Sequence, residues 1–324
     1  MIPRFLLIGA IVAVLAAAPW WADRGTIRLL VEALTLLALA QLWNLLAGYA
    51  GLISVGQQAF VGLGGYLLFS LAMFAGVPVL WALPLVGMLC ALIALPVGAL
   101  AFRLTGPYFA IGTWVIAEVF RLGFAQVGSL GGGSGISLPV GLVREIADGR
   151  GAREALIYWL ALGLAVGVTL SVWAALRART GLMLGAVRDD AEAAAALGVR
   201  VLRVKFGVYV AVAGATGLVG ALAFLQRLRI TPEAAFSVTD WSVVVIFVVV
   251  IGGIGALEGP ILGVVLFFAL REVLSDLGSW YLVILGITSI AVMLVEPKGL
   301  WGLLTRHREV RLFPISAPLP RSLR

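Results

Sequence analysis

The chain is divided into apolar stretches, each about as long as a helix needs to be to cross a membrane. A bilayer core about 30 Å thick is spanned by roughly 20 helical residues, and the backbone groups inside it must be bonded within the protein. The sequence therefore predicts an all-α integral membrane protein, a polytopic helical bundle with about ten transmembrane segments. The segments are residues 5–21, 27–46, 53–74, 80–102, 108–127, 155–176, 204–225, 241–254, 260–274 and 280–295.

The composition supports lipid as the surrounding solvent. Hydrophobic residues make up 62% of the chain and charged residues only 12%, whereas a soluble domain carries roughly 25% charged residues. The single cysteine, Cys90, excludes an intrachain disulfide framework, and with the single histidine, His307, it leaves no Cys/His metal cluster. We expect Cys90 to be a packing residue, and we expect neither a cofactor nor a metal.

The distribution of basic residues predicts the orientation, because cytoplasmic connections are enriched in Lys and Arg. With both termini in the cytoplasm, about fourteen basic residues fall inside and about seven outside. The inner set is Arg4, Arg103, Arg177, Arg179, Arg188, Arg200, Arg203, Lys205, Lys298, Arg306, Arg308, Arg311, Arg321 and Arg324. The outer set is Arg24, Arg28, Arg144, Arg150, Arg153, Arg227 and Arg229.

The first apolar stretch has a second interpretation. Arg4 followed by an apolar run and three alanines at 16–18 also resembles a signal peptide with a cleavage site. The run continues to Trp21, which is longer than a usual signal core of about 7–15 residues. Cleavage would leave the orientation of the later segments unchanged.

Two connections differ from the other, shorter ones. Residues 128–135 are glycine-rich and are followed by a mixed-charge segment to Glu154, which we place outside, where it is long enough to pack on the bundle. Residues 177–205 form the most polar internal segment, which we place in the cytoplasm.

Residues 186–200 of the cytoplasmic segment predict a short helix along the inner face. Its alanine run favours helix, acidic residues at its start suit the positive end of the helix dipole, and a glycine suits its end. It is either a connector on the membrane surface or a docking helix for a cytoplasmic partner. The candidate docking residues are Asp190, Glu192, Ala193, Ala194 and Gly198.

Polar side chains inside the apolar segments are candidates for a translocation pathway, because ionisable groups in a membrane are costly. Glu118 and Arg121 are three residues apart on one helix face, so they form either a structural ion pair or part of the pathway. Four further polar residues near the second and third segments either line the pathway or cap a broken helix. They are Asn44, Ser54, Gln57 and Gln58.

Glycines and a proline predict an interruption between the eighth and ninth segments, and this connection is a candidate gate. Unwound backbone at membrane depth is tolerated only against protein or a water-filled cavity. The residues concerned are Gly252, Gly253, Gly255, Gly259 and Pro260. Small residues also recur every four positions, and such strips allow close helix packing. The two strips are Gly255, Gly259 and Gly263, and Ala213, Gly217 and Ala221.

The sequence offers no arrangement typical of an enzyme. It shows no nucleophile with a base, no paired carboxylates and no metal-ligand cluster. Neither Lys205 nor Lys298 follows a glycine, so the chain has no phosphate-binding Gly-Lys-Ser/Thr loop. If ATP drives this protein, a separate chain must hydrolyse it.

Several motifs in matching order, from about residue 30 to residue 304, are similar to the permeases of branched-chain amino-acid importers, of the subunit type called LivM. They are GPYFAI at 106–111 with EVFR at 118–121, SVGQQAF at 54–60 with GGY at 64–66, GGIG at 252–255 with EGP at 258–260, and EPKGLW at 296–301. Residues 192–198 also resemble the loop by which importer permeases of the ATP-binding-cassette class engage their ATPases.

The resemblance implies a transmembrane permease domain over residues 1–304, with a coupling helix at 186–200, and a cytoplasmic tail over 305–324. It implies a bacterial inner-membrane importer for branched-chain amino acids, or for related solutes such as urea or amides. The implied partners are a homologous second permease, two ATPase subunits and a periplasmic solute-binding protein. The segment at 130–135 departs from the family, which commonly has Thr before the glycines and Asp or Asn near Ser134.

A secondary transporter driven by an ion gradient is the alternative, because broken helices and an intramembrane carboxylate can serve ion coupling. Such a carrier needs no docking segment at 192–198. Dissipating the proton gradient at constant ATP would stop it, whereas an ATPase inhibitor would stop an importer.

Overall fold

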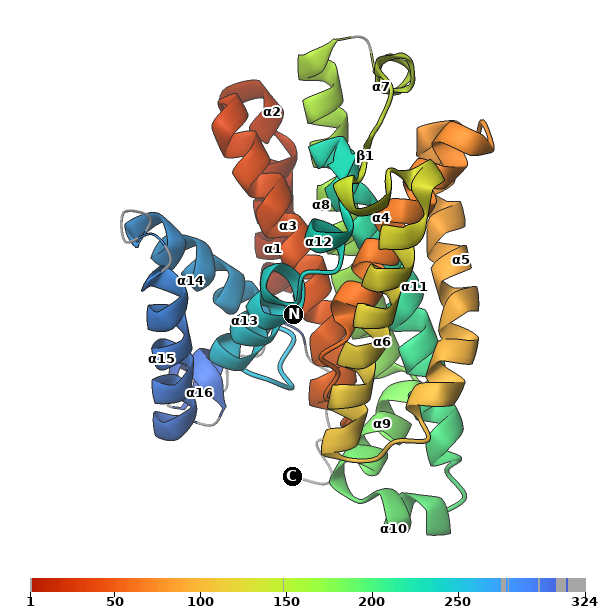
Figure 1. The fold of residues 1–324 in the computed structure, drawn as a ribbon. Helices are drawn as coiled ribbons and strands as arrows, with labels where there is room; N and C mark the ends of the chain where they lie inside the picture. The colour runs from red at the N-terminus through yellow and green to blue at the C-terminus, as the bar shows by residue number, and fades with distance from the viewer. Residues whose placement is uncertain are drawn as a thin grey trace.

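The computed structural model describes residues 2–147, 149–274, 278, 280–296, 298–306 and 313. The predicted tail at 305–324 therefore lies almost entirely outside the described residues, as do His307 and Pro297. Nearly all of the described chain is helical, and the helices form a tall bundle with a smaller group, α13 to α16, beside it (Figure 1).

The first half of the chain forms the outer helices and most of the centre of the bundle. Its helices are α1 (Ile2–Ala16), α2 (Ala18–Trp21), α3 (Arg24–Asn44), α4 (Gln57–Phe74), α5 (Val79–Ala101), α6 (Pro107–Gln126) and α7 (Val140–Ile146). A π-helical turn, η1 (Leu45–Tyr49), continues α3, and two short 3-10 turns, η2 (Gly128–Leu130) and η3 (Gly132–Ser134), precede the strand β1 (Ile136–Ser137).

The second half completes the bundle and adds the smaller group. Its helices are α8 (Arg150–Arg177), α9 (Arg179–Asp189), α10 (Ala191–Ala196), α11 (Val201–Arg227), α12 (Pro232–Ala235), α13 (Val244–Gly252), α14 (Gly259–Val273), α15 (Trp280–Val295) and α16 (Gly299–Thr305). The strand β2 (Arg229–Ile230) follows α11, and a π-helical turn, η4 (Val238–Val243), precedes α13.

Seven of the ten predicted segments form helical stretches long and apolar enough to cross a membrane in the described part of the chain. The first, ninth and tenth form shorter helices, α1 and α14 with 15 residues each and α15 with 16. The sixth begins earlier than predicted, at Arg150, and the eighth begins at Pro232 with α12 and η4. The chain is thus an all-α protein with the helices of a membrane protein.

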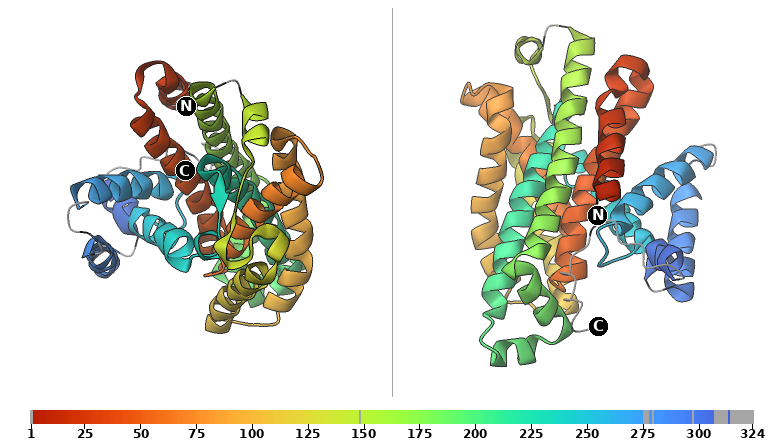
Figure 2. Two further views of the ribbon diagram at one scale, coloured as in Figure 1. Left: turned by 45° about the horizontal axis from the view of Figure 1, so that its top comes forward. Right: turned by 180° about the vertical axis from the view of Figure 1, so that it is seen from behind.

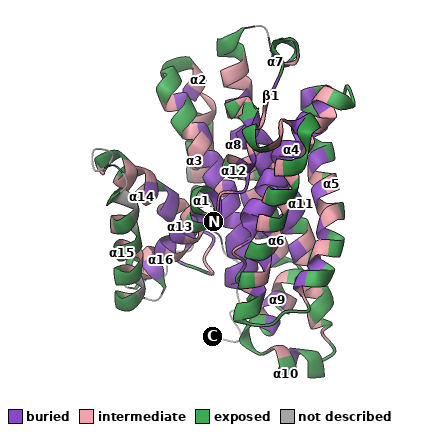
Figure 3. Cartoon of the chain, in the orientation of Figure 1, coloured by how far each residue is buried: buried purple, intermediate pink, exposed green. Residues whose placement is uncertain are grey.

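The helices α3, α4 and α11 occupy the centre. In the most apolar windows of α4 and α11, 72% of the residues are buried, against 28% for α5 and 17% for α6. Figure 3 shows buried residues gathered along the central helices and exposed ones on the peripheral helices. Because α6 exposes large apolar side chains such as Tyr108, Ile111 and Val119, we expect lipid or another subunit to cover it.

Glycines set the distance between the central helices. A Cβ atom on Gly64 of α4 would overlap the backbone carbonyl of Gly217 on α11, and one on Gly217 would overlap the Cys90 side chain of α5. Cys90 itself is buried. The small-residue strip that includes Gly217 therefore lies at the contact of three helices, where backbones approach closely.

The glycine-rich connection packs on one end of the bundle. β1 and β2 pair antiparallel, with Ile136 opposite Ile230 and Ser137 opposite Arg229. Gly135 has a φ of +73°, and a Cβ atom there would overlap the carbonyl of Ile230. Seen from behind, this end lies opposite the one that carries α9 and α10 (Figure 2).

We expect Gly64→Ala to destabilise the protein by about 1–3 kcal/mol, the usual cost of inserting atoms into a packed interior. The measurement is the midpoint of thermal unfolding of the purified protein in detergent. Gly163→Ala on α8 is the matched control, because nothing lies within 4 Å of its added Cβ atom. Equal midpoints for the two variants would contradict the close contact between α4 and α11.

Candidate translocation and coupling site

The connection between α13 and α14 leaves the helical conformation where the sequence predicts an interruption. Gly253 and Gly255 have φ values of +128° and +78°, which L side chains rarely adopt. A Cβ atom on Gly252 would overlap the carbonyl of Gly259, so the two helix ends pack backbone to backbone. Pro260 occupies the first turn of α14, where its missing N–H is not needed.

Two amide side chains of α3 form hydrogen bonds with the non-helical backbone of this connection. Asn44 Oδ1 accepts from Gly255 N at 2.8 Å, and Asn44 Nδ2 donates to Ala256 O at 2.8 Å. Gln41 Nε2 donates to Leu257 O at 2.7 Å. Both amide residues have no exposed surface, so they supply the bonds that water cannot supply at membrane depth. We call Gln41, Asn44 and residues 255–257 the amide clasp.

The other predicted polar residues surround the break between α3 and α4. Gln57 Nε2 donates to Leu39 O at 3.0 Å, Ser54 Oγ accepts from Gly56 N at 3.2 Å, and Gln58 Oε1 accepts from the Ser242 hydroxyl. All three are buried. These contacts join α4 to α3 and to η4, and both predicted roles, capping of a broken helix and lining of a translocation pathway, stay predictions.

The segment predicted to be cytoplasmic forms a short helix, α10, at one end of the bundle (Figure 1). Asp190 caps it, because its Oδ1 accepts from the N–H groups of Glu192 and Ala193, each at 2.9 Å. Gly198 ends the segment with a φ of +88°. The helix exposes Glu192 and Ala193 but buries Ala194. Its use as a docking site stays a prediction.

Arg188, at the end of α9, connects the segment that contains α10 to the amide clasp. Its Nη1 donates to Gly48 O in the turn η1 at 3.3 Å, and its Nη2 lies 3.3 Å from Asp189 Oδ1. Gly48 packs directly on the clasp, since a Cβ atom there would lie 2.6 Å from both Asn44 Oδ1 and Gly255 N. Arg188, Gly48 and Asn44 thus form a continuous line of contacts.

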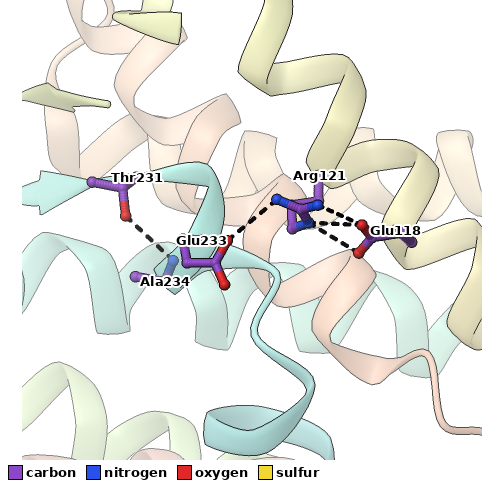
Figure 4. Close-up of polar contacts among 5 residues, drawn as sticks. All are labelled: Glu118, Arg121, Thr231, Glu233 and Ala234. Carbon is purple, nitrogen blue, oxygen red and sulfur yellow. Dashed lines mark hydrogen bonds and ion pairs between the residues drawn. The ribbon is translucent and has the colours of Figure 1, made fainter. Parts of the chain in front are cut away.

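Glu118 and Arg121 form an ion pair on α6, apart from the clasp. Arg121 Nε donates to both carboxylate oxygens of Glu118 at 2.9 Å, and Nη1 donates to Glu233 Oε2 of α12 at 3.2 Å (Figure 4). Among the described residues, no hydrogen bond or ion pair joins them to Asn44, Ser54, Gln57 or Gln58. The pair therefore links α6 to α12, and a translocation role for it stays a prediction.

Sequence reasoning missed Gln41, Arg188 and Glu233. Gln41 is three residues before Asn44, which places both amides on one helix face. That spacing within an apolar segment was a usable signal. The partners of Arg188 and Glu233 lie 140 and 112 residues away in sequence, so local patterns do not reveal them.

The chain is similar to a known protein family and to two known proteins. Residues 25–294 match the family described as "Branched-chain amino acid transport system / permease component". The chain is 26% identical over 317 residues to the high-affinity branched-chain amino acid transport system permease protein LivM of Escherichia coli, covering 91% of this chain and 74% of that protein. The same protein of Salmonella typhimurium gives the same values. No solved structure matches the chain.

We expect Asn44→Leu to loosen the connection between α13 and α14. The variant leaves Gly255 N and Ala256 O, which are half-buried, without their partner. A fully buried unpaired group costs about 1–3 kcal/mol, which is the upper limit of the loss for each. Hydrogen exchange of the peptide that contains residues 253–258 should accelerate, and the unfolding midpoint should fall. Ser171→Ala, on an exposed position of α8, is the control. Unchanged exchange at Gly255 would show that the clasp does not hold the connection.

Proposed function

The chain belongs to the family of branched-chain amino acid transport system permease components, and from this premise we propose that it is one of two permease subunits in an ATP-binding-cassette importer. The importer carries branched-chain amino acids or related small solutes such as urea or amides. The pathway lies between this chain and a homologous second permease. Two ATPase subunits bind from the cytoplasm, and a periplasmic solute-binding protein delivers the solute.

The observation that carries the proposal is the placement of α10. It stands at the tip of the bundle beyond the ends of α8 and α11, with Leu197 86% exposed beside it. An exposed leucine next to a capped helix with a small-residue face suits insertion into a groove of another protein. The similarity of residues 192–198 to the ATPase-binding loop of such importers supports an ATPase as that protein.

The same proposal gives the topology. The chain is a multi-pass inner-membrane protein with both termini in the cytoplasm, so α10 lies on the side of the membrane that contains ATP. Ten segments cross the membrane in this proposal: the seven long helical stretches and the shorter helices α1, α14 and α15. At 1.5 Å per residue a helix of 15 residues is about 22 Å long. Such helices cross where the bilayer thins locally or where neighbouring subunits cover their ends.

The line of contacts through Arg188 supplies the coupling. A displacement of α10 by the ATPases moves α9, whose end carries Arg188 against Gly48. Gly48 packs on Gly255 and Asn44, so the movement reaches the connection between α13 and α14. The packed interior transmits such a displacement because it is dense and has few voids. The glycines of that connection then act as the hinge of the gate.

We expect Glu192→Lys to weaken ATPase association by about tenfold or more, because a reversed charge at a docking contact costs upward of 1.4 kcal/mol. The measurement is the amount of ATPase that co-purifies with the permease in mild detergent. Glu145→Lys, an identical change in α7 at the opposite end, is the control. Equal amounts of co-purified ATPase from both variants would contradict docking at α10. Ala194 is unsuitable for this test, because it is only 2% exposed and its replacement disturbs packing.

We expect Arg188→Gln to separate ATP hydrolysis from transport. The variant retains α10 and so keeps its ATPases, but it loses the charged donor to Gly48, a bond worth about 1.5–3 kcal/mol. The number of solute molecules imported per ATP should fall, measured in proteoliposomes with loaded binding protein. Arg203→Gln, an exposed basic residue on α11, is the control. A normal ratio for Arg188→Gln would exclude this route.

A further inference from the structure

A cavity that the sequence did not predict lies between α3, α11, η4 and α14. It encloses about 290 Å³, near the lower end of the range for ligand pockets, roughly 300–1,000 Å³. It therefore suits one small molecule. Glu32, on its wall, is eight residues into α3, or about 12 Å from the start of that helix at 1.5 Å per residue. Arg227 ends α11 and Asp240 precedes α13, so the cavity lies near one end of these helices.

Four ionisable side chains line this cavity, two of each sign. Glu32 of α3 and Asp240 of η4 are acidic, and Arg227 of α11 and Arg271 of α14 are basic. Convergent polar groups in one pocket are typical of a ligand-binding site, so these four side chains are candidate ligand contacts. The equal number of acidic and basic side chains favours one kind of ligand. A ligand with only one kind of charge would pair with either the acidic or the basic side chains, whereas a zwitterion can pair with both.

The ion pair across the cavity is open to exchange. Arg271 Nη1 lies 3.0 Å from Glu32 Oε1, and the two side chains are 42% and 44% exposed. Ion pairs this exposed add little to stability, so a ligand with both charges can replace the contact. Arg227 lies 5.1 Å above the Trp241 ring, and in the described part of the chain neither Arg227 nor Asp240 forms an ion pair.

The remaining wall is apolar. Leu36 and Leu39 of α3 and Phe267 of α14 line the cavity and are buried. An aliphatic side chain of a ligand placed against them would be removed from contact with water, which favours binding. Charges of both signs beside an apolar wall are the complement of an α-amino acid with an aliphatic side chain.

A second cavity lies beside the first. It encloses about 440 Å³ and is lined by Arg28, Arg150, Arg153 and Glu154. Gln226 and Arg227 line both cavities. Arg227 therefore lies at the boundary between the two cavities. We call the first the inner cavity and the second the outer cavity.

We propose that the inner cavity is a transient binding site of the permease itself for a zwitterionic α-amino acid with an aliphatic side chain. Its carboxylate binds Arg271 and its ammonium group binds Glu32, in place of their mutual ion pair. This inference rests on the proposed function, since it places the solute within the importer. Arg271 is near one end of α14 and the amide clasp holds the other, so movement at the clasp alters the separation of Arg271 from Glu32.

The test uses the assembled importer in nanodiscs, loaded binding protein and photo-leucine, a diazirine analogue of leucine. Irradiation should label peptides of α3, α13 and α14, and excess leucine should prevent labelling. Removing one charged partner, as in E32Q or R271Q, should lower labelling by about tenfold or more. R28Q and E154Q, which break the ion pair of 2.9 Å in the outer cavity, should leave these peptides labelled.

The exchanged pair E32R with R271E keeps one charge of each sign at the cavity, so a zwitterion can bind it in the reversed orientation. Labelling should therefore recover above that of either single variant. Unchanged labelling in E32Q and R271Q, with normal assembly, would overturn the proposal. Labelling confined to other helices while ATP drives uptake would overturn the site alone and leave the proposed function intact. A phosphatidylethanolamine headgroup carries the same two charges, so labelling that appears only in nanodiscs without that lipid would also overturn the proposal.

Discussion

The structure depends on how the protein satisfies backbone groups where its helices are interrupted at membrane depth. Lipid offers no hydrogen bonds, so an unwound connection needs partners within the protein. Gln41 and Asn44 supply them to residues 255–257 at 2.7–2.8 Å. Because both amides come from α3, the central helix fixes the position of α13, the start of α14 and the smaller helical group beside the bundle.

That constraint connects the two ends of the molecule. The turn η1 continues α3 beyond the clasp, and its Gly48 carbonyl accepts a hydrogen bond from Arg188 at the end of α9. In the other direction, α14 extends from the clasp to Arg271, which pairs with Glu32 of α3. A single buried contact region thus lies between the proposed ATPase contact and the proposed solute cavity. Rigid packing on both sides makes it suited to pass a displacement from one to the other.

The sequence was informative where one physical rule decides the outcome. Apolar length located seven long spans, and the glycines and proline at 252–260 located the interruption. The helix at 191–196 also follows from local propensity and its Asp190 cap. Contacts between distant segments were not predictable, such as Arg188 with Gly48 or Arg121 with Glu233. The charges around the inner cavity come from four separate elements, and only the fold brings them together.

The central claim is that force from a separate nucleotide-hydrolysing chain drives this bundle. The most direct measurement is leucine accumulation in proteoliposomes that contain both permeases and loaded binding protein, with the ATPase subunits present or omitted and the proton gradient collapsed. The account predicts accumulation only with the ATPases and ATP, and no loss when the gradient is removed. Accumulation at the full rate without the ATPases would contradict it.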